Sequence, residues 1–437
     1  MGEPCTRRLR TGGRLGAFEQ TLSRGAKGGG IKPLLQGAAI KLVSSEGQQK
    51  LLGDLNRALR ELRAQDQLRS LAQVTGVNLC SNDYLGLAEE PRLREATLEA
   101  VARAARVGGT GSRLLSGQDA VWNELEEEFA AFAGTNSALY FANGYAANIG
   151  LLSSVLGKGD LIFSDELNHA SLIDGIRLSG ARKEIYPHRD LNALEQALRQ
   201  HENETCRKLI VTESVFSMDG DIADVRAMQS LAEKYGANLV VDEAHATAVH
   251  GPCGAGIVAE GRLTPEVFAT VHTCGKALAS AGAFVCGSRV LREFLINHAR
   301  TLIFSTAMPP YMAGQIRAAL RLARGMDALR EALLTNAAEL SAALRIDGWD
   351  ARESASQIAP VVIGSNADAL AAASFLQERG FAVRAIRPPT VPVDTARLRL
   401  SLTARITREH VTGILAALQN WRKSQSSSAA AEVVGRA

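Results

Sequence analysis

The sequence predicts an α/β protein, in which a large, mostly parallel sheet with helices on both faces precedes a smaller C-terminal α+β domain. Short apolar runs alternate with amphipathic helical stretches, a pattern typical of parallel strands joined by crossover helices. The 437 residues, 46% of them hydrophobic, suffice for a large core and a second smaller domain. This composition does not indicate a fibrous, disordered or membrane protein.

The first fifty residues differ in composition from the rest. They hold nine Lys and Arg against three Asp and Glu, and ten of the 40 glycines, without a sustained helical or strand period. The whole chain carries +3, so the remainder sums to about −3, and the basic excess does not indicate nucleic-acid binding. We expect residues 1–50 to be a disordered leader, a transit peptide or sequence translated from an upstream start codon.

A helix and an arm are expected over residues 51–80. Leucines recur at helical spacing after the leader, at Leu52, Leu55, Leu59 and Leu62. The helix should run toward Leu71 and lead into the arm. Residues 81–320 are then expected to form the large domain, residues 321–423 the small domain, and residues 424–437, rich in Ser and Ala, a flexible tail.

The large domain should alternate strands with helices. Strands are expected at residues 138–142, 160–163, 208–212, 238–241 and 267–273. Helices are expected at residues 121–133, 145–156, 190–200 and 224–235. One long helical stretch near 309–345 should lead into the small domain, whose strands are expected near residues 359–363, 382–386 and 396–402.

Cysteine usage and hydropathy indicate the cellular compartment. The six cysteines lie far apart without a CxxC pair, which favours reduced thiols over disulfides and predicts no metal site. No apolar run is long enough to span a bilayer, and the sequence contains no apolar segment typical of a secretory signal. We therefore expect a cytoplasmic protein without membrane or nucleic-acid partners.

A lysine with small neighbours follows the last predicted strand of the large domain. Lys276 comes directly after Thr273, Cys274 and Gly275, and residues 277–282 after it are also mostly small. A lysine at a strand end can form a Schiff base with a cofactor aldehyde if its surroundings leave room. Taken alone, this pattern would also fit a solvated surface lysine.

A carboxylate and a histidine follow the strand at 238–241. Asp242 at this strand end could pair with the pyridine nitrogen of pyridoxal phosphate (PLP) and keep the ring protonated, while His245 could bind its phenolic oxygen. A capping aspartate and a locally satisfied histidine are the simpler alternatives. Asp-Glu-Ala-His is also a helicase Walker B spelling, but no GxxxxGK[ST] loop lies upstream.

Two more strand ends offer cofactor ligands. Gly144 and Tyr145 open a helix, whose free N–H groups and dipole can bind a phosphate. His169 follows the strand at 160–163 and could lie against a flat ring. The simpler alternatives are an ordinary strand-to-helix turn at Gly144 and a surface histidine at position 169. A phosphate-binding turn, an acid and a lysine at successive strand ends together meet the requirements of PLP binding.

In this order, the motifs resemble those of the α-oxoamine synthases, a family of fold-type I PLP enzymes, over nearly all of residues 52–422. The matching stretches are SNDYLGL (81–87), GGTGSRLLSG (108–117), ANGYAAN (142–148), NHAS (168–171), TESVFSMDGD (212–221), VDEAH (241–245), TCGK (273–276), IFSTAMPP (303–310) and RPPTVPVDTARLRLSLTA (387–404). The resemblance implies a fold-type I transferase that acts as a homodimer with shared active sites. Ala279 stands where a glycine is commoner in the family.

The resemblance also implies roles for single residues. Lys276 would bind PLP covalently, Asp242 would hold its pyridine nitrogen, and His169 would stack on the ring. The catalytic group would be Lys276, His169, Asp242 and His245. Further cofactor contacts would come from Gly144, Tyr145, Ser217 and Thr273, with Ser305 and Thr306 reaching in from a neighbouring subunit. Substrate would be bound by Arg69, Asn82, Thr390 and Arg399, with Arg399 clamping the amino-acid carboxylate through two hydrogen bonds.

The stretch at 387–404 looks most like the family branch that joins L-alanine to a pimeloyl thioester with loss of carbon dioxide, in biotin biosynthesis. The acyl group would arrive on CoA or on acyl carrier protein, which makes the expected activity an acyltransferase. Three alternatives stay open: a sister synthase that uses glycine or serine with another acyl-CoA, an aminotransferase-like enzyme, and a non-catalytic relative.

Overall fold

The structure, a computed structural model, describes the backbone of residues 45–434 and the side chains of residues 45–426. The predictions for residues 1–44 and 435–437 lie outside the described residues. The described residues divide into two units, one that ends at Glu61 and one that begins at Leu62. No helix in the described part of the chain is long and apolar enough to cross a membrane.

The predicted N-terminal helix is α1 (Glu46–Ala64), which begins inside the leader that was expected to lack structure. Glu46 in its first turn and Arg63 in its last turn both complement the helix dipole. The helix ends before the predicted Leu71 because Asp66 adopts a left-handed backbone, with φ of 53°, that cannot continue an α-helix.

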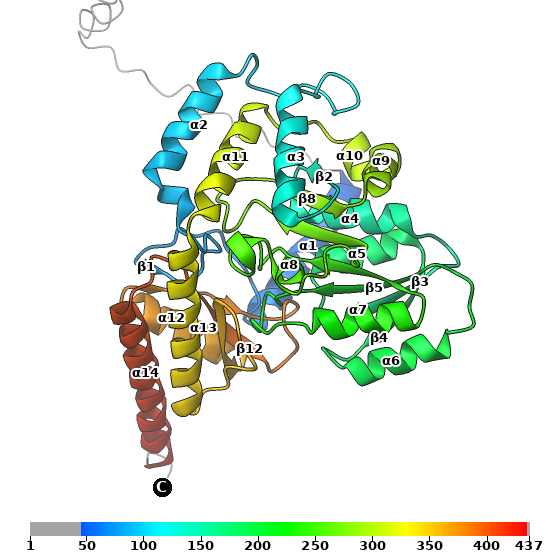
Figure 1. Ribbon diagram of the computed structural model, residues 1–437. Helices are drawn as coiled ribbons and strands as arrows, with labels where there is room; N and C mark the ends of the chain where they lie inside the picture. Colours follow the sequence, from blue (N-terminus) through cyan, green and yellow to red (C-terminus); the bar gives the residue numbers. More distant parts are fainter. Residues whose placement is uncertain (1–44, 435–437) are drawn as a thin grey trace, which may run out of the picture. The chain divides into compact units, whose positions relative to one another are not determined.

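The large sheet has seven strands in the order β2-β8-β7-β6-β5-β3-β4 (Figure 1). They are β2 (Ser137–Phe141), β3 (Leu161–Asp165), β4 (Arg182–Tyr186), β5 (Lys208–Glu213), β6 (Asn238–Asp242), β7 (Ala269–Thr273) and β8 (Ala283–Gly287). The strands from β3 to β7 are all parallel to their neighbours in the order β4-β3-β5-β6-β7, whereas β8 runs antiparallel to β7 and β2. The predicted mostly parallel sheet is confirmed, with β4 and β8 as additional strands.

Helices cover both faces of this sheet, as the sequence predicts (Figure 1). One face carries α4 (Gly144–Val155), α5 (Ala170–Ser179) and α9 (Arg289–His298), and the other carries α3 (Ala120–Ala133), α6 (Leu191–Gln200) and α7 (Val225–Lys234). Successive strand residues belong to different cores: Ile162 packs beneath α4 and α5, whereas Phe163 packs beneath α6 and α7. Strands buried on both faces explain the continuous apolar runs of the sequence.

The small domain contains a three-stranded antiparallel sheet in the order β11-β12-β9. Helix α11 (Tyr311–Arg324) packs against α3 of the large domain and leads into the small domain. The elements that follow are α12 (Asp327–Ile346), β9 (Ile358–Gly364), α13 (Asn366–Gln377), β10 (Phe381–Ala382), β11 (Ala385–Ile386), β12 (Ala396–Ser401) and α14 (Arg408–Val434). The helical stretch predicted at 309–345 is two helices, because the chain leaves the helical conformation at Gly325 and Met326. Helix α14 also continues through the expected loose segment at 424–434, where a run of alanines favours helix.

Short elements join these parts. They are β1 (Val77–Asn78), η1 (Leu87–Glu89), α2 (Pro91–Arg103), η2 (Pro252–Gly254), α8 (Ile257–Glu260) and α10 (Arg300–Ile303). Strand β1, in the predicted arm, pairs in parallel with β10 and thereby joins the arm to the small domain.

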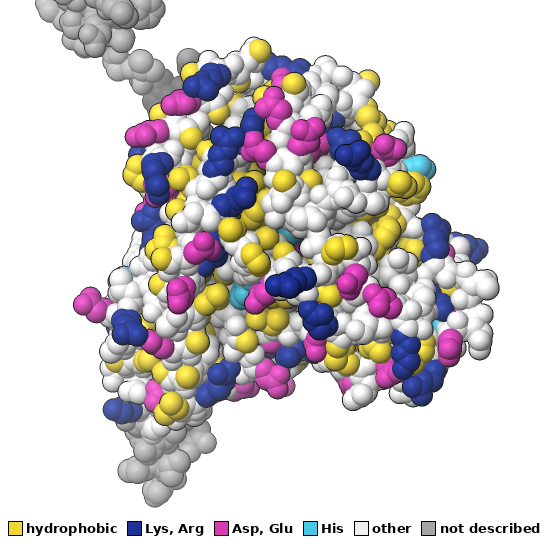
Figure 2. All heavy atoms as spheres, viewed as in Figure 1, with side chains coloured by type: hydrophobic (Ala, Val, Ile, Leu, Met, Phe, Trp, Pro, Cys, Tyr) yellow, Lys and Arg dark blue, Asp and Glu magenta, His cyan; other side chains and the backbone are white. Residues whose placement is uncertain are grey.

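Charged side chains of both signs are interspersed on the face drawn in Figure 2. Arginines and lysines there alternate with aspartates and glutamates, without a continuous basic patch. Nucleic-acid binding proteins typically present such a patch. This face therefore gives no support to a nucleic-acid function.

The loop after β7 contains a strained residue, which gives a first testable prediction. Ala279 has φ of 45°, in the left-handed region that glycine adopts more readily. Ala279→Gly should raise the free energy of unfolding in urea by about 1 kcal/mol. The control Ala281→Gly, in the same loop but without a positive φ, should lower it. If Ala279→Gly is no more stable than Ala281→Gly, the loop is not strained.

Candidate active site

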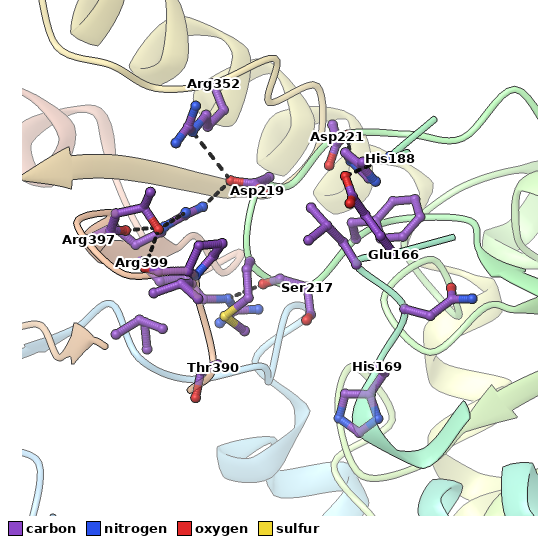
Figure 3. Close-up of a pocket in the computed structure, with 18 of the residues that line it drawn as sticks. Glu166, His169, His188, Ser217, Asp219, Asp221, Arg352, Thr390, Arg397 and Arg399 are labelled. Atoms are coloured by element: carbon purple, nitrogen blue, oxygen red, sulfur yellow. Dashed lines mark hydrogen bonds and ion pairs between the residues drawn. The ribbon is translucent and has the colours of Figure 1, made fainter. Parts of the chain in front are cut away.

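A cavity of about 1330 Å³ opens at the carboxyl ends of the parallel strands and is lined by residues of both domains (Figure 3). Seven of the predicted site residues line it: Asn82, His169, Ser217, His245, Lys276, Thr390 and Arg399. The other predicted residues lie outside its lining. Open α/β sheets bind ligands at this edge, so the position agrees with the expected site.

Lys276 lies in the loop after β7, with its amine in the cavity wall. Two main-chain hydrogen bonds close this loop, from Cys274 N–H to Gly282 O (2.9 Å) and from Ser280 N–H to Cys274 O (2.9 Å). Burial lowers the pKa of the Lys276 amine below its ordinary value, against the opposing effect of the Asp242 carboxylate. A lysine that loses its proton more easily is a better nucleophile and base.

Asp242 is buried at the end of β6, below the cavity lining, and both of its carboxylate oxygens accept hydrogen bonds. Oδ1 accepts from the main-chain N–H of Ala244 at 2.9 Å, and Oδ2 accepts from Asn148 Nδ2 at 2.7 Å. Because burial of a carboxyl group is costly unless it is hydrogen-bonded, these two donors offset that cost. Asp242 is therefore suited to hold a cationic partner.

The N-terminus of α4 lies beside the end of β7. Gly144 begins this helix, and a Cβ at this position would come within 2.7 Å of Thr273 Cγ2, so only a glycine allows the close approach. The side chain of Asn143 caps the helix by accepting from the N–H of Ala146 at 2.7 Å. The predicted phosphate-binding residues Gly144 and Thr273 are thus brought together by the fold.

Tyr145 lies next to His169, and both were predicted to contact the cofactor. Their ring centroids are 6.2 Å apart in an edge-on arrangement, and the Tyr145 hydroxyl donates to Asp174. His169 stays exposed to the cavity, which it lines. One face of its ring is therefore open to a ligand.

His245 is buried and takes part in a hydrogen-bond network that the sequence did not reveal. Its Nδ1 lies 2.6 Å from the hydroxyl oxygen of Tyr84, which also donates to Asn82 Oδ1 at 3.1 Å. Burial, with help from the positive charge of Lys276, lowers the pKa of His245 well below its ordinary value. The imidazole is therefore neutral at physiological pH.

Arg399 is buried in β12 and directs its guanidinium to the same network. It donates to Asn82 Oδ1 (3.1 Å), to the Tyr84 hydroxyl (3.4 Å), to Ser401 Oγ and to the main-chain oxygen of Ser217. Within residues 45–426, no carboxylate forms an ion pair with it. Its neighbour Arg397, by contrast, is paired with Asp219 (Figure 3). A buried arginine without an acidic partner is prepared to bind an anion from outside the chain.

Arg69, Ser305 and Thr306 are among the predicted residues outside the cavity lining. Arg69 donates to the main-chain oxygens of Arg387 (3.5 Å) and Pro388 (3.2 Å), next to the rim that Thr390 forms. Ser305 and Thr306 lie between α10 and α11, and neither lines the cavity of its own chain. Their contribution to a neighbouring subunit stays a prediction.

Glu243, next to Asp242, has a structural role. Its carboxylate accepts from the main-chain N–H groups of Ile257 and Val258, both at 2.9 Å, and so ties the end of β6 to α8. The Asp-Glu-Ala-His spelling is therefore not that of a nucleotide-binding motif here.

Four functional candidates were missed: Tyr84, Asn148, Ser171 and Glu213. Each lies inside a motif that the sequence analysis singled out, but its role depends on a partner far away in the sequence. Glu213 ends β5, and its Oε1 accepts from the main-chain N–H of His169 at 2.7 Å. Burial raises the pKa of the Glu213 carboxyl group, and the nearby Asp242 charge raises it further.

This raised pKa predicts a pH-dependent loss of stability. The folded protein keeps a proton on Glu213 that the unfolded chain releases near the ordinary glutamate pKa, so stability should fall as pH rises from there to the raised pKa. The loss from this group should reach about 1.4 kcal/mol per pH unit. Glu213→Gln, which stays neutral, should show less of this loss in denaturant titrations at several pH values. The exposed control Glu331→Gln should follow the wild type, and parallel curves for all three proteins would contradict the prediction.

Comparisons with known proteins agree with this geometry. The sequence profile of the family "Aminotransferase class I and II" matches residues 74–418. Two curated relatives are named 8-amino-7-oxononanoate synthase. The protein of Geobacter sulfurreducens is 45% identical over 361 residues, covering 79% of this chain and 92% of its own. The protein of Methylococcus capsulatus is 48% identical over 343 residues, covering 78% of this chain and 88% of its own.

Solved structures show the same fold. A serine palmitoyltransferase from S. paucimobilis, with a bound PLP–myriocin aldimine, has a TM-score of 0.79 at 28% identity and covers 86% of this chain and 98% of its own. The 8-amino-7-oxononanoate synthase of Francisella tularensis has a TM-score of 0.70 at 27% identity and covers 80% of this chain and 99% of its own. The predicted family and the fold-type I architecture are therefore confirmed. This chain belongs to the class I and II aminotransferase family and, within it, to the 8-amino-7-oxononanoate synthases.

Proposed function

We propose that this protein binds PLP through Lys276 and joins L-alanine to a pimeloyl thioester, with loss of carbon dioxide, to form 8-amino-7-oxononanoate. The observation that carries the proposal is the placement of three groups at one cavity. A lysine with a lowered pKa and an arginine without an acidic partner line this cavity, and a buried carboxylate lies below its lining. Its relatives' shared name gives the reaction.

The residues present fit PLP. Lys276 would hold its aldehyde carbon, Asp242 its pyridine nitrogen, and the α4 N-terminus at Gly144, with Thr273, its phosphate. Ser217 and His245 would lie near its phenolic oxygen. When bound, PLP supplies a protonated ring that accepts the electron pair left at the substrate α-carbon.

The side chains divide the reaction between them. Arg399 would bind the alanine carboxylate until it leaves as carbon dioxide, and Lys276 Nζ would take the α-proton and later return a proton to the same carbon. A new carbon–carbon bond forms between that carbon and the thioester carbonyl, while the thiol leaves. Thr390, at the rim, and Arg69 beyond it would face the acyl donor, on CoA or acyl carrier protein.

A sister synthase that uses glycine or serine is the nearest alternative. The curated relatives at 45–48% identity favour alanine, whereas serine palmitoyltransferase is only 28% identical. Product analysis by mass with pimeloyl-CoA and each of the three amino acids separates these substrates. A higher kcat/KM for glycine or serine than for alanine would overturn the substrate assignment.

We include a homodimer in this proposal. Ala307 N–H donates to Gly111 O (2.8 Å) and joins two loops that expose the apolar side chains of Phe304 and Leu115. Exposed apolar side chains on adjoining loops are typical of a subunit interface. Ser305, beside Phe304, would then reach the partner's cofactor. A cytoplasmic location stays a prediction.

Removing the lysine amine tests the proposal directly. Lys276→Ala should abolish both product formation and the absorbance of the lysine-bound cofactor, because no other group supplies the Schiff-base nitrogen. The exposed control Lys234→Ala should keep both. Undiminished turnover by Lys276→Ala would refute the assignment.

Shortening the anion-binding arginine tests the substrate side. Arg399→Lys keeps the charge but loses the paired N–H groups, so the KM for alanine should rise by about ten-fold to a hundred-fold. Steady-state kinetics at saturating pimeloyl-CoA measure this change. The exposed control Arg321→Lys should leave the KM unaltered. If Arg399→Lys affected only the KM of the thioester, Arg399 would belong to the acyl side.

A further inference from the structure

The ring of His169 is held by a main-chain hydrogen bond as well as by its neighbours. His169 is the N-cap of α5, and its Nδ1 accepts from the main-chain N–H of Ser171 at 3.2 Å. A main-chain N–H can only donate a hydrogen bond. Nδ1 must therefore present a lone pair, and the neutral ring carries its proton on Nε2.

A second donor reaches the same nitrogen. Ser171 Oγ lies 2.7 Å from His169 Nδ1, and it also accepts from Asn148 Nδ2 at 2.9 Å. Because Asn148 donates to this oxygen, the hydroxyl hydrogen of Ser171 is free to point at Nδ1. Ser171 is buried, so water does not compete for these hydrogen bonds.

The orientation of the Asn148 amide is fixed by the carboxylate below it. Its Nδ2 donates to Asp242 Oδ2 at 2.7 Å as well as to Ser171 Oγ. Turning the amide over would set Asn148 Oδ1 against the Asp242 carboxylate, two acceptors facing each other. One amide therefore links Asp242 to Ser171, and through it to His169.

On balance, the surroundings of His169 disfavour its protonation. Partial burial lowers the pKa of the imidazole, the Asp242 carboxylate opposes this effect, and the positive charge of Lys276 lowers the pKa further. The positive end of the α5 dipole also disfavours a cation. Glu213 accepts from the main-chain N–H of His169 and is itself largely protonated, so it adds little negative charge. A proton on Nδ1 would face the main-chain N–H of Ser171, which can only donate, and this hydrogen bond would be lost.

We propose that Asn148 and Ser171 are positioning residues that hold His169 in the Nε2–H tautomer, so that its ring donates a hydrogen bond into the cavity and does not act as a base. Since Nδ1 already accepts hydrogen bonds from Ser171, the Nε2–H is the ring group that is left to face a ligand in the cavity. The inference rests on the proposed function only for the identity of the substrate oxygen that receives this hydrogen bond. Removal of the α-proton is then left to Lys276 alone.

Nitrogen NMR tests the tautomer without any substrate. PLP-loaded full-length protein with ¹⁵N-labelled histidine rings should show, near neutral pH, a His169 signal with a protonated Nε2 and an unprotonated Nδ1. His169→Phe, which keeps a flat ring, assigns the signal by its disappearance. A protonated Nδ1, in either the other tautomer or the imidazolium, would overturn the inference.

Kinetics test the two positioning residues. Ser171→Ala removes the hydroxyl donor and should lower kcat about five-fold to thirty-fold with little change in the KM for alanine. Ser171→Thr, which keeps the hydroxyl, should recover most of the loss. The control Ser179→Ala, in the same helix, should behave as wild type. A Ser171→Ala enzyme with wild-type kcat would contradict the role of Ser171.

The two proposals fail in different ways. If no amino acid and thioester give product but the NMR spectrum shows the Nε2–H ring, the proposed function fails and the tautomer inference stands. If product forms normally and the ring carries its proton on Nδ1, the inference alone fails.

Folding of Ser171→Ala is checked by its retained cofactor absorbance.

Discussion

Lys276 and Asp242 meet at one edge of the sheet because β6 and β7 are parallel neighbours, with Asp242 beside Val271 in the register. Their proximity creates an energetic problem, since a buried amine and a buried carboxylate both lose hydration. Asp242 is stabilised by the Asn148 amide and the Ala244 N–H, whereas Lys276 keeps only partial compensation and its pKa falls. The carboxylate is thus held in place by two hydrogen bonds, and the amine is left reactive. The other site residues surround this pair of a hydrogen-bonded carboxylate and a reactive amine.

The small domain completes the site by supplying an anion-binding group. Arg399 and Arg397 lie two residues apart in β12, on the same face of the strand, yet only Arg397 is neutralised, by Asp219. Arg399 instead donates to neutral oxygens of Asn82, Tyr84 and Ser217, which orient the guanidinium without cancelling its charge. The same Tyr84 hydroxyl contacts His245, so the residues proposed for the substrate side and for the cofactor side share one hydrogen-bond network. In the proposed function, this network would couple substrate binding to cofactor orientation.

Much of this site could be predicted because its residues follow apolar strands, and parallel strands end at one edge. Lys276, Asp242, His169 and Gly144 were found in that way. Strand β4 was missed because this edge strand is mostly exposed and polar, so it lacks an apolar run. Asn148 and Ser171 were missed because their roles arise from contacts across the fold, such as the one between Asn148 and Asp242. The family resemblance supplied residue roles that spacing alone could not, whereas hydrogen-bond direction, and with it the tautomer of His169, needed the three-dimensional arrangement.

We propose that the lysine opposite Asp242 is the one that binds PLP. Borohydride reduction of the PLP-loaded protein makes that bond permanent, and peptide mass spectrometry then locates the modified side chain. We expect one phosphopyridoxyl group per chain, on the peptide that contains Lys276. A label on another lysine, or no label in protein that has taken up PLP, would contradict it.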